Sequence, residues 1–182
     1  WGFAEREENK FDTDYIKYLK QLVQKLDEYG IYVILDMHQD ILSSAFSSYD
    51  AIPLWLVKKL SNLRFKWMKY PWPLDRSLPH WSFGYLTYEV NKVFQELYDD
   101  KHAVYLMSRF WMKLASEFKD ISSVLGYNPI NEPWAGDVYA DPFLLLPSVA
   151  ASRNLLPLYD TINRYVRDID DKAIFFYEPV TW

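Results

Sequence analysis

Apolar residues recur at helical spacing in three segments of this chain, and each segment leads into a short apolar run. Residues 14–29 form the first segment, with lysine and glutamine on the opposite side. Its apolar positions are Tyr15, Leu19, Leu22, Val23, Leu26 and Tyr29. Asp12 or Thr13 can cap the start, and Gly30 can end the helix in a left-handed conformation. The spacing therefore predicts an amphipathic helix.

The run that follows, residues 31–36, reads Ile-Tyr-Val-Ile-Leu-Asp. A nearly continuous apolar run with β-branched members is typical of a strand buried on both faces of a parallel sheet. The same order recurs twice. Helices are predicted over 102–119 and 155–169, and strands within 121–130 and 173–177. Helix–strand units in series indicate an α/β fold with a parallel sheet and the helices outside it.

Two connections are far longer than the few residues that usually join such elements. They span roughly residues 41–101, with a short helix predicted over 91–98, and residues 135–154. The first is rich in tryptophan, at Trp55, Trp67, Trp72 and Trp81. Both follow the C-terminal ends of predicted strands, where parallel α/β folds bind ligands. Residues 1–3, Trp-Gly-Phe, are interpreted as the remnant of a further strand.

Composition narrows the class of protein. The 182 residues suffice for one domain with a sizeable core, and the 19% of aromatic residues predict that some rings face solvent or ligand. The net charge of −5 with scattered basic residues argues against nucleic-acid binding. The absence of cysteine excludes disulfides, thiolate nucleophiles and cysteine-based zinc sites. No apolar run approaches the length needed to span a membrane.

Polar side chains follow the ends of two predicted strands. Residues 36–40 read Asp-Met-His-Gln-Asp, and residues 131–133 read Asn-Glu-Pro. Because neighbouring strand ends converge in a parallel barrel, we expect His38, Asp40 and Glu132 to meet around one ligand. A carboxylic acid beside an amide suits proton donation to a leaving group. An isolated Asn-Glu-Pro also fits a simple turn, and acid catalysis on sugars usually needs a second carboxylate.

Two other kinds of chemistry are less favoured. Asp36, His38 and Asp40 alternate along the chain, as ligands of a metal ion could. The remaining histidines lie elsewhere, since His80 falls in the long connection and His102 at a predicted helix start. We therefore expect neither a metal nor another cofactor. Catalysis by a serine–histidine–aspartate triad is disfavoured because no Gly-x-Ser-x-Gly turn is present.

The two polar motifs together resemble those of the family-five glycoside hydrolases. They read Leu-Asp-Met-His-Gln-Asp at 35–40 and Tyr-Asn-Pro-Ile-Asn-Glu-Pro-Trp at 127–134. Within that family the chain is most similar to the endoglycoceramidases, a match supported by Ala-Ile-Pro-Leu-Trp at 51–55 and by the aromatic insertion. The resemblance implies a (β/α)8 TIM barrel. We expect residues 1–182 to be an internal fragment of its catalytic domain, from about strand two or three to strand five or six, with the insertion after strand three.

The resemblance also implies retaining hydrolysis through two glutamates. Glu132 matches the acid/base, and Asn131 matches the neighbour that binds the 2-hydroxyl of the sugar. His38 and Asp40 match residues lining the subsite where the bond breaks. Trp134 is assigned to substrate binding as well.

The second glutamate of the family follows the seventh strand of the barrel. At about thirty residues per strand–helix unit, it is expected about ninety or more residues after Glu132. Glu178 also ends a predicted strand but comes only 46 residues later. We expect Glu178 to have a structural or partner-binding role, and the nucleophile to lie outside this chain. The 182 residues alone are accordingly predicted to be inactive.

The activity implied is cleavage of the β-glycosidic bond between oligosaccharide and ceramide in glycosphingolipids. A glucosylceramidase or β-glucanase of the same family remains an alternative, as does a truncated paralogue that binds glycolipid without cleaving it. The expected partners are a glycosphingolipid or oligosaccharide substrate and the surface of a membrane or micelle, with no nucleic acid. We expect a monomer. A secreted or endolysosomal location follows from the resemblance alone.

Overall fold

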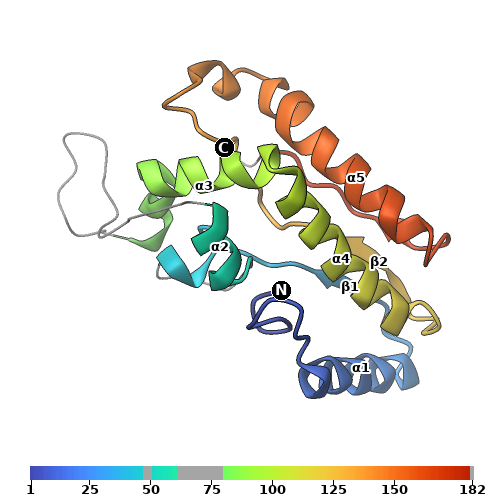
Figure 1. Ribbon diagram of the computed structural model, residues 1–182. Coiled ribbons are helices and arrows are strands. Elements are labelled where there is room, and N and C mark those ends of the chain that lie inside the picture. Colours follow the sequence, from blue (N-terminus) through green and yellow to red (C-terminus); the bar gives the residue numbers. More distant parts are fainter. Residues whose placement is uncertain (47–50, 61–79, 181–182) are drawn as a thin grey trace.

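The fold is organised around a three-stranded parallel sheet (Figure 1). The computed structural model describes residues 1–46, 51–60 and 80–180. The strands, adjacent in chain order, are β1 (Val33–Asp36), β2 (Val124–Asn128) and β3 (Ile174–Phe175). Each lies within one of the three predicted apolar runs, and the predicted α/β class with a parallel sheet is confirmed.

The strand register aligns the C-terminal ends of β1 and β2. Val33 pairs with Val124 and, after an irregularity in the pairing, Asp36 pairs with Asn128. The segments that follow these two strands therefore leave the same edge of the sheet. This is the edge at which the sequence places its polar motifs.

Helices α4 (Lys101–Phe118) and α5 (Leu156–Arg167) run side by side across the sheet, and α1 (Thr13–Glu28) packs against α4 (Figure 1). Each precedes a strand, as predicted. Five apolar residues at helical spacing in α4 are all buried: Ala103, Leu106, Phe110, Leu114 and Phe118. Burial of this stripe against the sheet and α5 stabilises the helix far more than its intrinsic propensity does.

The helix ends follow local capping chemistry. The Asp12 side chain accepts a hydrogen bond from the backbone N–H of Tyr15 at 2.9 Å, as predicted. Asp100 caps α4 in the same way, accepting from the N–H of Ala103 at 3.0 Å. Gly30 has a φ of +69°, which confirms the predicted left-handed stop.

Three sequence-based predictions about burial and strands are wrong. Leu22 of α1 and Tyr29, which directly follows the helix, are exposed, because α1 contacts the rest of the protein through a narrower face that includes Ile16 and Val23. Strand β1 is not buried on both faces, since Ile34 is 43% exposed and the described elements cover only the other face.

Residues 1–3 form a turn and no strand. The Trp1 ring is buried against Phe110, with the ring centroids 5.4 Å apart and the planes nearly parallel. Its indole N–H donates to the carboxylate of Glu5 at 2.8 Å. This apolar start of the chain packs against a helix, which its composition alone could not distinguish from pairing in a sheet.

The first long connection contains ordered elements. They are the 3₁₀ turn η1 (Ser44–Phe46), helix α2 (Leu54–Leu60), the 3₁₀ turn η2 (Trp81–Leu86) and helix α3 (Tyr88–Asp99). The helix predicted over 91–98 lies within α3. Trp81 is 41% exposed, whereas the Trp55 indole N–H donates to the carbonyl of Glu5 at 2.8 Å. Trp67 and Trp72 lie outside the described residues.

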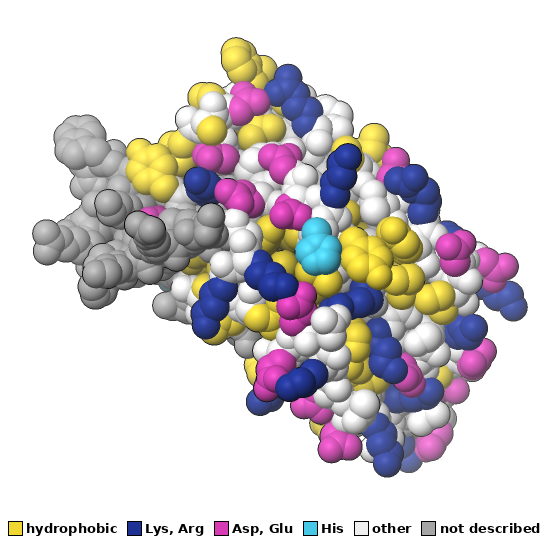
Figure 2. Space-filling model, in the orientation of Figure 1, with side chains coloured by type: hydrophobic (Ala, Val, Ile, Leu, Met, Phe, Trp, Pro, Cys, Tyr) yellow, Lys and Arg dark blue, Asp and Glu magenta, His cyan; other side chains and the backbone are white. Residues whose placement is uncertain are grey.

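The second connection carries the 3₁₀ turn η3 (Pro142–Leu145) and the π-helical turn η4 (Ala151–Leu155), which leads directly into α5. None of the described helices is both long and apolar enough to cross a membrane. Acidic and basic side chains are interspersed over the face drawn in Figure 2. That face therefore presents charges of both signs to a partner.

Candidate active site

The segments that follow β1 and β2 are bonded to each other through their backbones. The N–H of Met37 donates to the carbonyl of Asn128 at 3.2 Å, and the N–H of Asn131 donates to the carbonyl of Met37 at 3.1 Å. The ladder between the strands thus continues past their ends. It brings the His38–Asp40 segment alongside Asn131 and Glu132, as the convergence of strand ends predicts.

Gln39 joins the two segments a second time. Its side chain is fully buried, and its Nε2 donates to the carbonyls of Asn131 at 2.9 Å and Glu132 at 2.8 Å. Its Oε1 accepts from the N–H of Leu42 at 2.8 Å. The hydroxyl of Tyr85 lies 3.1 Å from the same Nε2. Every hydrogen-bonding group of this buried amide is therefore satisfied within the site.

Glu132 lies in a bend four residues past the end of β2, with its side chain partly exposed. Its φ is +41°, in the left-handed region that residues with a Cβ rarely adopt. Its backbone N–H donates to Oε2 of Glu178 at 2.9 Å. Oε1 of Glu178 accepts from the side-chain amide of Asn128. Both carboxylate oxygens of Glu178 are thus engaged by donors from β2 and the bend.

His38 contacts a carboxylate of the preceding strand. Its Nδ1 lies 3.2 Å from Oδ2 of Asp36, and 60% of the imidazole side chain is exposed. Partial burial raises the pKa of Asp36 above its usual value, and the negative charge of Glu178 raises it further, while the contact with His38 lowers it. Asp36 and Glu178 are therefore close enough for their charges to interact.

Tyr85 lies close to two of the predicted site residues. Burial is the main cause that raises the pKa of its phenol, and the negative charges of Asp40 and Glu132 raise it as well. The hydrogen bond with Gln39 acts in the opposite direction. Asp40 is 9% exposed. The charges of Asp40 and Glu132 thus both act on the phenol of Tyr85.

Trp134 lies deeper than a surface platform for a sugar would. It is 5% exposed, its indole N–H donates to Oδ1 of Asn91 at 2.8 Å, and its carbonyl accepts from the hydroxyl of Tyr98 at 2.6 Å. Its ring also contacts Tyr85, with centroids 5.5 Å apart. An edge of Trp134 nevertheless lines a pocket of about 290 Å³, together with residues of η2. A role in substrate binding stays a prediction that this pocket permits.

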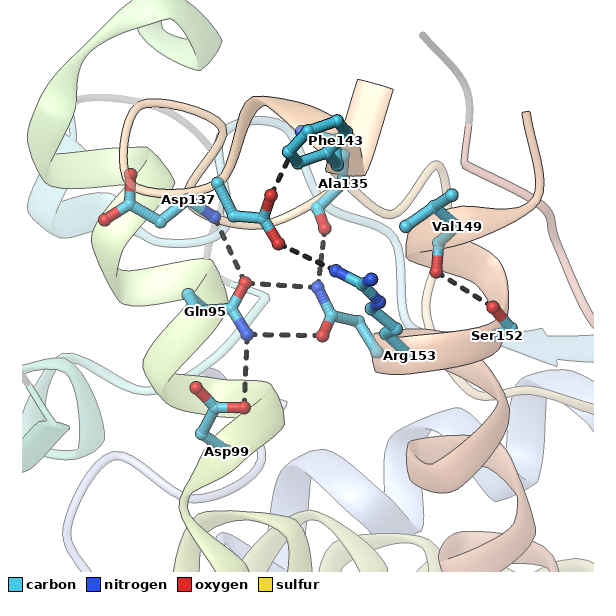
Figure 3. Close-up of polar contacts among 10 residues, drawn as sticks. Gln95, Asp99, Ala135, Asp137, Phe143, Val149, Ser152 and Arg153 are labelled. Atoms are coloured by element: carbon cyan, nitrogen blue, oxygen red, sulfur yellow. Dashed lines mark hydrogen bonds and ion pairs between the residues drawn. The ribbon is translucent and has the colours of Figure 1, made fainter. Parts of the chain in front are cut away.

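A pair of amides anchors the connection that follows Trp134 (Figure 3). Gln95 of α3 and Asn154 of η4 exchange two hydrogen bonds, of 3.2 and 3.1 Å. Gln95 also accepts from the N–H of Asp137 at 3.2 Å, and Asn154 donates to the carbonyl of Ala135 at 2.7 Å. Both ends of the connection are therefore held against α3. We call residues 135–154 the strap.

A second pocket, of about 490 Å³, opens between the start of α5 and the segment after β3. Its lining includes Leu155, Leu156, Tyr159, Tyr177 and Glu178. The hydroxyl of Tyr159 donates to the backbone carbonyl of Glu178 at 2.8 Å. The lining of this pocket thus includes the residue whose carboxylate contacts the Glu132 backbone.

Three residues at the site have no catalytic or substrate-binding role assigned by the sequence: Gln39, Tyr85 and Glu178. The sequence did contain a signal for Gln39. Side chains alternate along an extended segment, so Gln39 points to the side opposite His38 and Asp40, which is the inner side. Tyr85 comes from the long connection, whose path the sequence does not predict. For Glu178 the sequence predicts a structural or partner-binding role, and its hydrogen bonds with Asn128 and the Glu132 backbone are compatible with the structural one.

The described residues offer no set of ligands for the metal ion that the alternation of Asp36, His38 and Asp40 suggested. Asp36 and His38 contact each other, but the described residues contain no group of three histidine, cysteine or acidic side chains arranged to hold an ion. The chemical groups that this part of the chain offers are carboxyl groups, amides, a phenol and the imidazole of His38.

Several known proteins are similar to this chain in sequence. The family model described as Cellulase (glycosyl hydrolase family 5) matches residues 2–182. An endoglycoceramidase of Cyanea nozakii is 38% identical over 94% of this chain, and one of Hydra vulgaris is 37% identical over all of it. The chain spans only 36% and 37% of the length of these two relatives.

Solved structures show the same fold. Endo-glycoceramidase II from Rhodococcus sp., in its complex with ganglioside GM3, superposes with a TM-score of 0.76 at 22% identity. The match covers 98% of this chain and 39% of that enzyme.

A more distant relative by sequence is a glucosylceramidase of Rhizopus delemar (strain RA 99-880). It is 25% identical over 72% of this chain and 22% of its own length.

Proposed function

Since the chain belongs to glycosyl hydrolase family 5, we propose that it forms part of a retaining glycosidase that acts on glycosphingolipids. The reaction would cleave the β-glycosidic bond between oligosaccharide and ceramide. The observation that carries this proposal is the similarity to two endoglycoceramidases at 37–38% identity over nearly the whole chain. This narrower match favours a ceramide aglycone over the glucans that the name of the family suggests.

Glu132 is the proposed acid/base. A protonated carboxyl at this position would donate to the departing ceramide oxygen, and the carboxylate would then take a proton from the attacking water. Asn131, adjacent to it, would bind the 2-hydroxyl of the sugar. His38 and Asp40 would line the subsite where the bond breaks, and Trp134 would border it. We propose a monomer that works at a lipid or micelle surface, in a secreted or endolysosomal setting.

The nucleophile is proposed to be a second glutamate outside this chain. Retaining glycosidases hold their two carboxyl groups about 5 Å apart, with the nucleophile free to attack the anomeric carbon. Glu178 fits that role poorly, since its two oxygens accept hydrogen bonds from Asn128 and from the Glu132 backbone. The relatives are more than twice as long as this chain, which leaves room for the second glutamate.

The test uses the full-length polypeptide that carries these residues, incubated with a ganglioside. We expect intact oligosaccharide and free ceramide as products. Glu132→Gln should lower the rate about 100-fold or more, because it removes the acid. Glu117→Gln is the matched control, since Glu117 pairs with Lys20 and Lys113 on the outer face of the molecule. Equal rates for the two variants would refute the role of Glu132.

A second candidate activity is that of a glucosylceramidase, which the similarity to the Rhizopus delemar protein favours. The two activities share Asn131 and Glu132 and differ in the glycan that they release. Incubation with glucosylceramide alone separates them. Release of glucose at a rate exceeding that of oligosaccharide release from ganglioside would favour the second candidate.

A further inference from the structure

The backbone of Glu132 is held in an unfavourable conformation. A φ of +41° lies in the left-handed region, where the Cβ of a residue other than glycine is crowded by the backbone. The following residue is Pro133, whose ring restricts the residue before it to extended conformations. The free chain would thus avoid the observed geometry at this position. Contacts from elsewhere in the fold must maintain it.

The first such contact reaches the N–H of Glu132. Oε2 of Glu178 accepts it at 2.9 Å, and a hydrogen bond to a carboxylate is stronger than one to a neutral acceptor. Glu178 is itself held from two sides. Asn128 donates to its Oε1, and Tyr159 donates to its backbone carbonyl at 2.8 Å. This contact therefore comes from the segment after β3.

The second contact reaches the carbonyl of Glu132. Nε2 of Gln39 donates to it at 2.8 Å, and donates to the carbonyl of Asn131 at 2.9 Å. The Gln39 side chain has no solvent exposure, and its Oε1 is fixed by the N–H of Leu42 at 2.8 Å. This contact comes from the segment after β1. The two clamping side chains thus approach from the strands on either side of β2.

We infer that Gln39 and Glu178 are positioning residues that clamp the backbone of Glu132 and thereby aim its carboxyl group. The inference rests on the proposed function of Glu132 as the acid/base. A fixed φ determines the direction in which the Cα–Cβ bond leaves the backbone. Proton transfer requires the carboxyl group within hydrogen-bond distance of the leaving oxygen. Released from either contact, the bend would relax and turn the acid away from that oxygen.

The test compares two substrates with the same sugar and different leaving groups. Octyl β-lactoside releases a poor leaving group that must be protonated as it departs, whereas dinitrophenyl β-lactoside releases a phenolate without help. A misplaced acid lowers kcat/KM for the octyl substrate only. A general loss of folded protein lowers it for both in proportion. The variants are Glu178→Gln, Glu178→Asp and Gln39→Met, each made in the full-length polypeptide.

Each variant should lose about 100-fold in kcat/KM on octyl β-lactoside, as small misplacements of catalytic groups do, and less than about threefold on dinitrophenyl β-lactoside. Asp170→Asn is the matched control. Asp170 lies between α5 and β3, whereas Glu178 follows β3; it is 8% exposed and accepts from the hydroxyl of Tyr127 at 2.7 Å. Its substitution should lower both rates by the same factor.

The outcome for Glu132→Gln separates the two proposals. If Glu132→Gln loses activity on the octyl substrate alone and the clamp variants lose it equally on both, Glu132 is the acid and the positioning role is refuted. If Glu132→Gln loses equally on both substrates, the acid is another group and both proposals fall. If circular dichroism shows that one clamp variant is unfolded, the other two decide the outcome. For each of them, the loss of kcat/KM on the octyl substrate is compared with the loss on the dinitrophenyl substrate.

Discussion

Tyr127 lies in the middle of β2 with its ring fully buried, and its hydroxyl donates to Oδ2 of Asp170 at 2.7 Å. Burial is the main cause that raises the pKa of this phenol far above its usual value, and the hydrogen bond to Asp170 adds to it. The folded protein therefore binds the phenolic proton more tightly than the unfolded chain does. The stability due to this difference is complete below about pH 10 and is lost as the pH rises further.

Tyr127→Phe should accordingly change the alkaline behaviour of the protein. At pH 8 we expect the free energy of unfolding to fall by about 1 kcal/mol, because a hydrogen bond is lost. Above about pH 10 the loss of stability per pH unit should be smaller in the variant, by up to about 1.4 kcal/mol. Urea unfolding between pH 8 and pH 11.5 measures both quantities. Equal alkaline slopes in the two proteins would contradict the prediction.

Individual residues also show where sequence reasoning works. Asp12 and Gly30 were predicted correctly as helix ends, because capping depends on neighbours three or four residues away. Gln39 received no role, although it lies between two residues that did. Its partners Asn131 and Glu132 are 92 and 93 residues away. Periodicity does not identify partners at such separations.

Among the larger elements, the strap is held by the amide pair of Gln95 and Asn154, and Gly136 lies directly over that pair. Its φ is +117°, and a Cβ added there would lie 2.2 Å from Oε1 of Gln95 and 2.7 Å from Nδ2 of Asn154. Any side chain at this position must displace the amides. The strap follows Trp134 and connects it to α5. Loosening it should also disturb the environment of Trp134.

Gly136→Ala is predicted to lower the free energy of unfolding by about 3 kcal/mol, from backbone strain and the loss of buried hydrogen bonds. Gly30→Ala is the matched control. Gly30 also has a positive φ, of +69°, but a Cβ there meets nothing within 4 Å, so only about 1–2 kcal/mol should be lost. Urea unfolding measures both. Limited proteolysis should cut the strap faster in Gly136→Ala alone, and equal destabilisation of the two variants would contradict the predicted steric effect.

The main helices and strands were predicted correctly, whereas the conformation of short apolar segments was not. The helices and strands of all three units lie where periodicity places them, and α3 extends a predicted helix. The strand expected at residues 1–3 is instead a turn packed on α4, and α2 was not predicted. Short apolar segments fit a strand, a helix or a packed turn equally well. Contacts with distant residues decide among these.

On the scale of the whole molecule, one face of the sheet remains open in the described part of the chain. Ile34 and Ile174 pair with Gly126 from either side and are 43% and 52% exposed. Leu125, which precedes Gly126 in the central strand β2, is 36% exposed. An apolar row of this kind is a surface that further protein or a partner normally covers.

Membership of family 5, predicted from two motifs, is confirmed by the match over residues 2–182.

The 182 residues expressed alone should therefore bind the dye ANS, which fluoresces on exposed apolar surface. They should release no oligosaccharide from ganglioside, because only one of the two proposed catalytic glutamates is present. The full-length polypeptide is the control and should bind less dye per molecule while releasing product. Retaining hydrolysis by the isolated segment, abolished by Glu132→Gln, would show that the second carboxylate lies within these residues.

The sequence by itself determined the helix–strand order, the helix ends, the family and the position of Glu132 at one edge of the sheet. Spacing, capping and a contiguous motif are local properties, so neighbouring residues suffice to read them. Only the tertiary structure decided that Gln39 and Glu178 grip the backbone of Glu132, that Trp134 is buried and that one face of the sheet is open. Those features depend on contacts between residues tens of positions apart, which form only when the strands are assembled side by side.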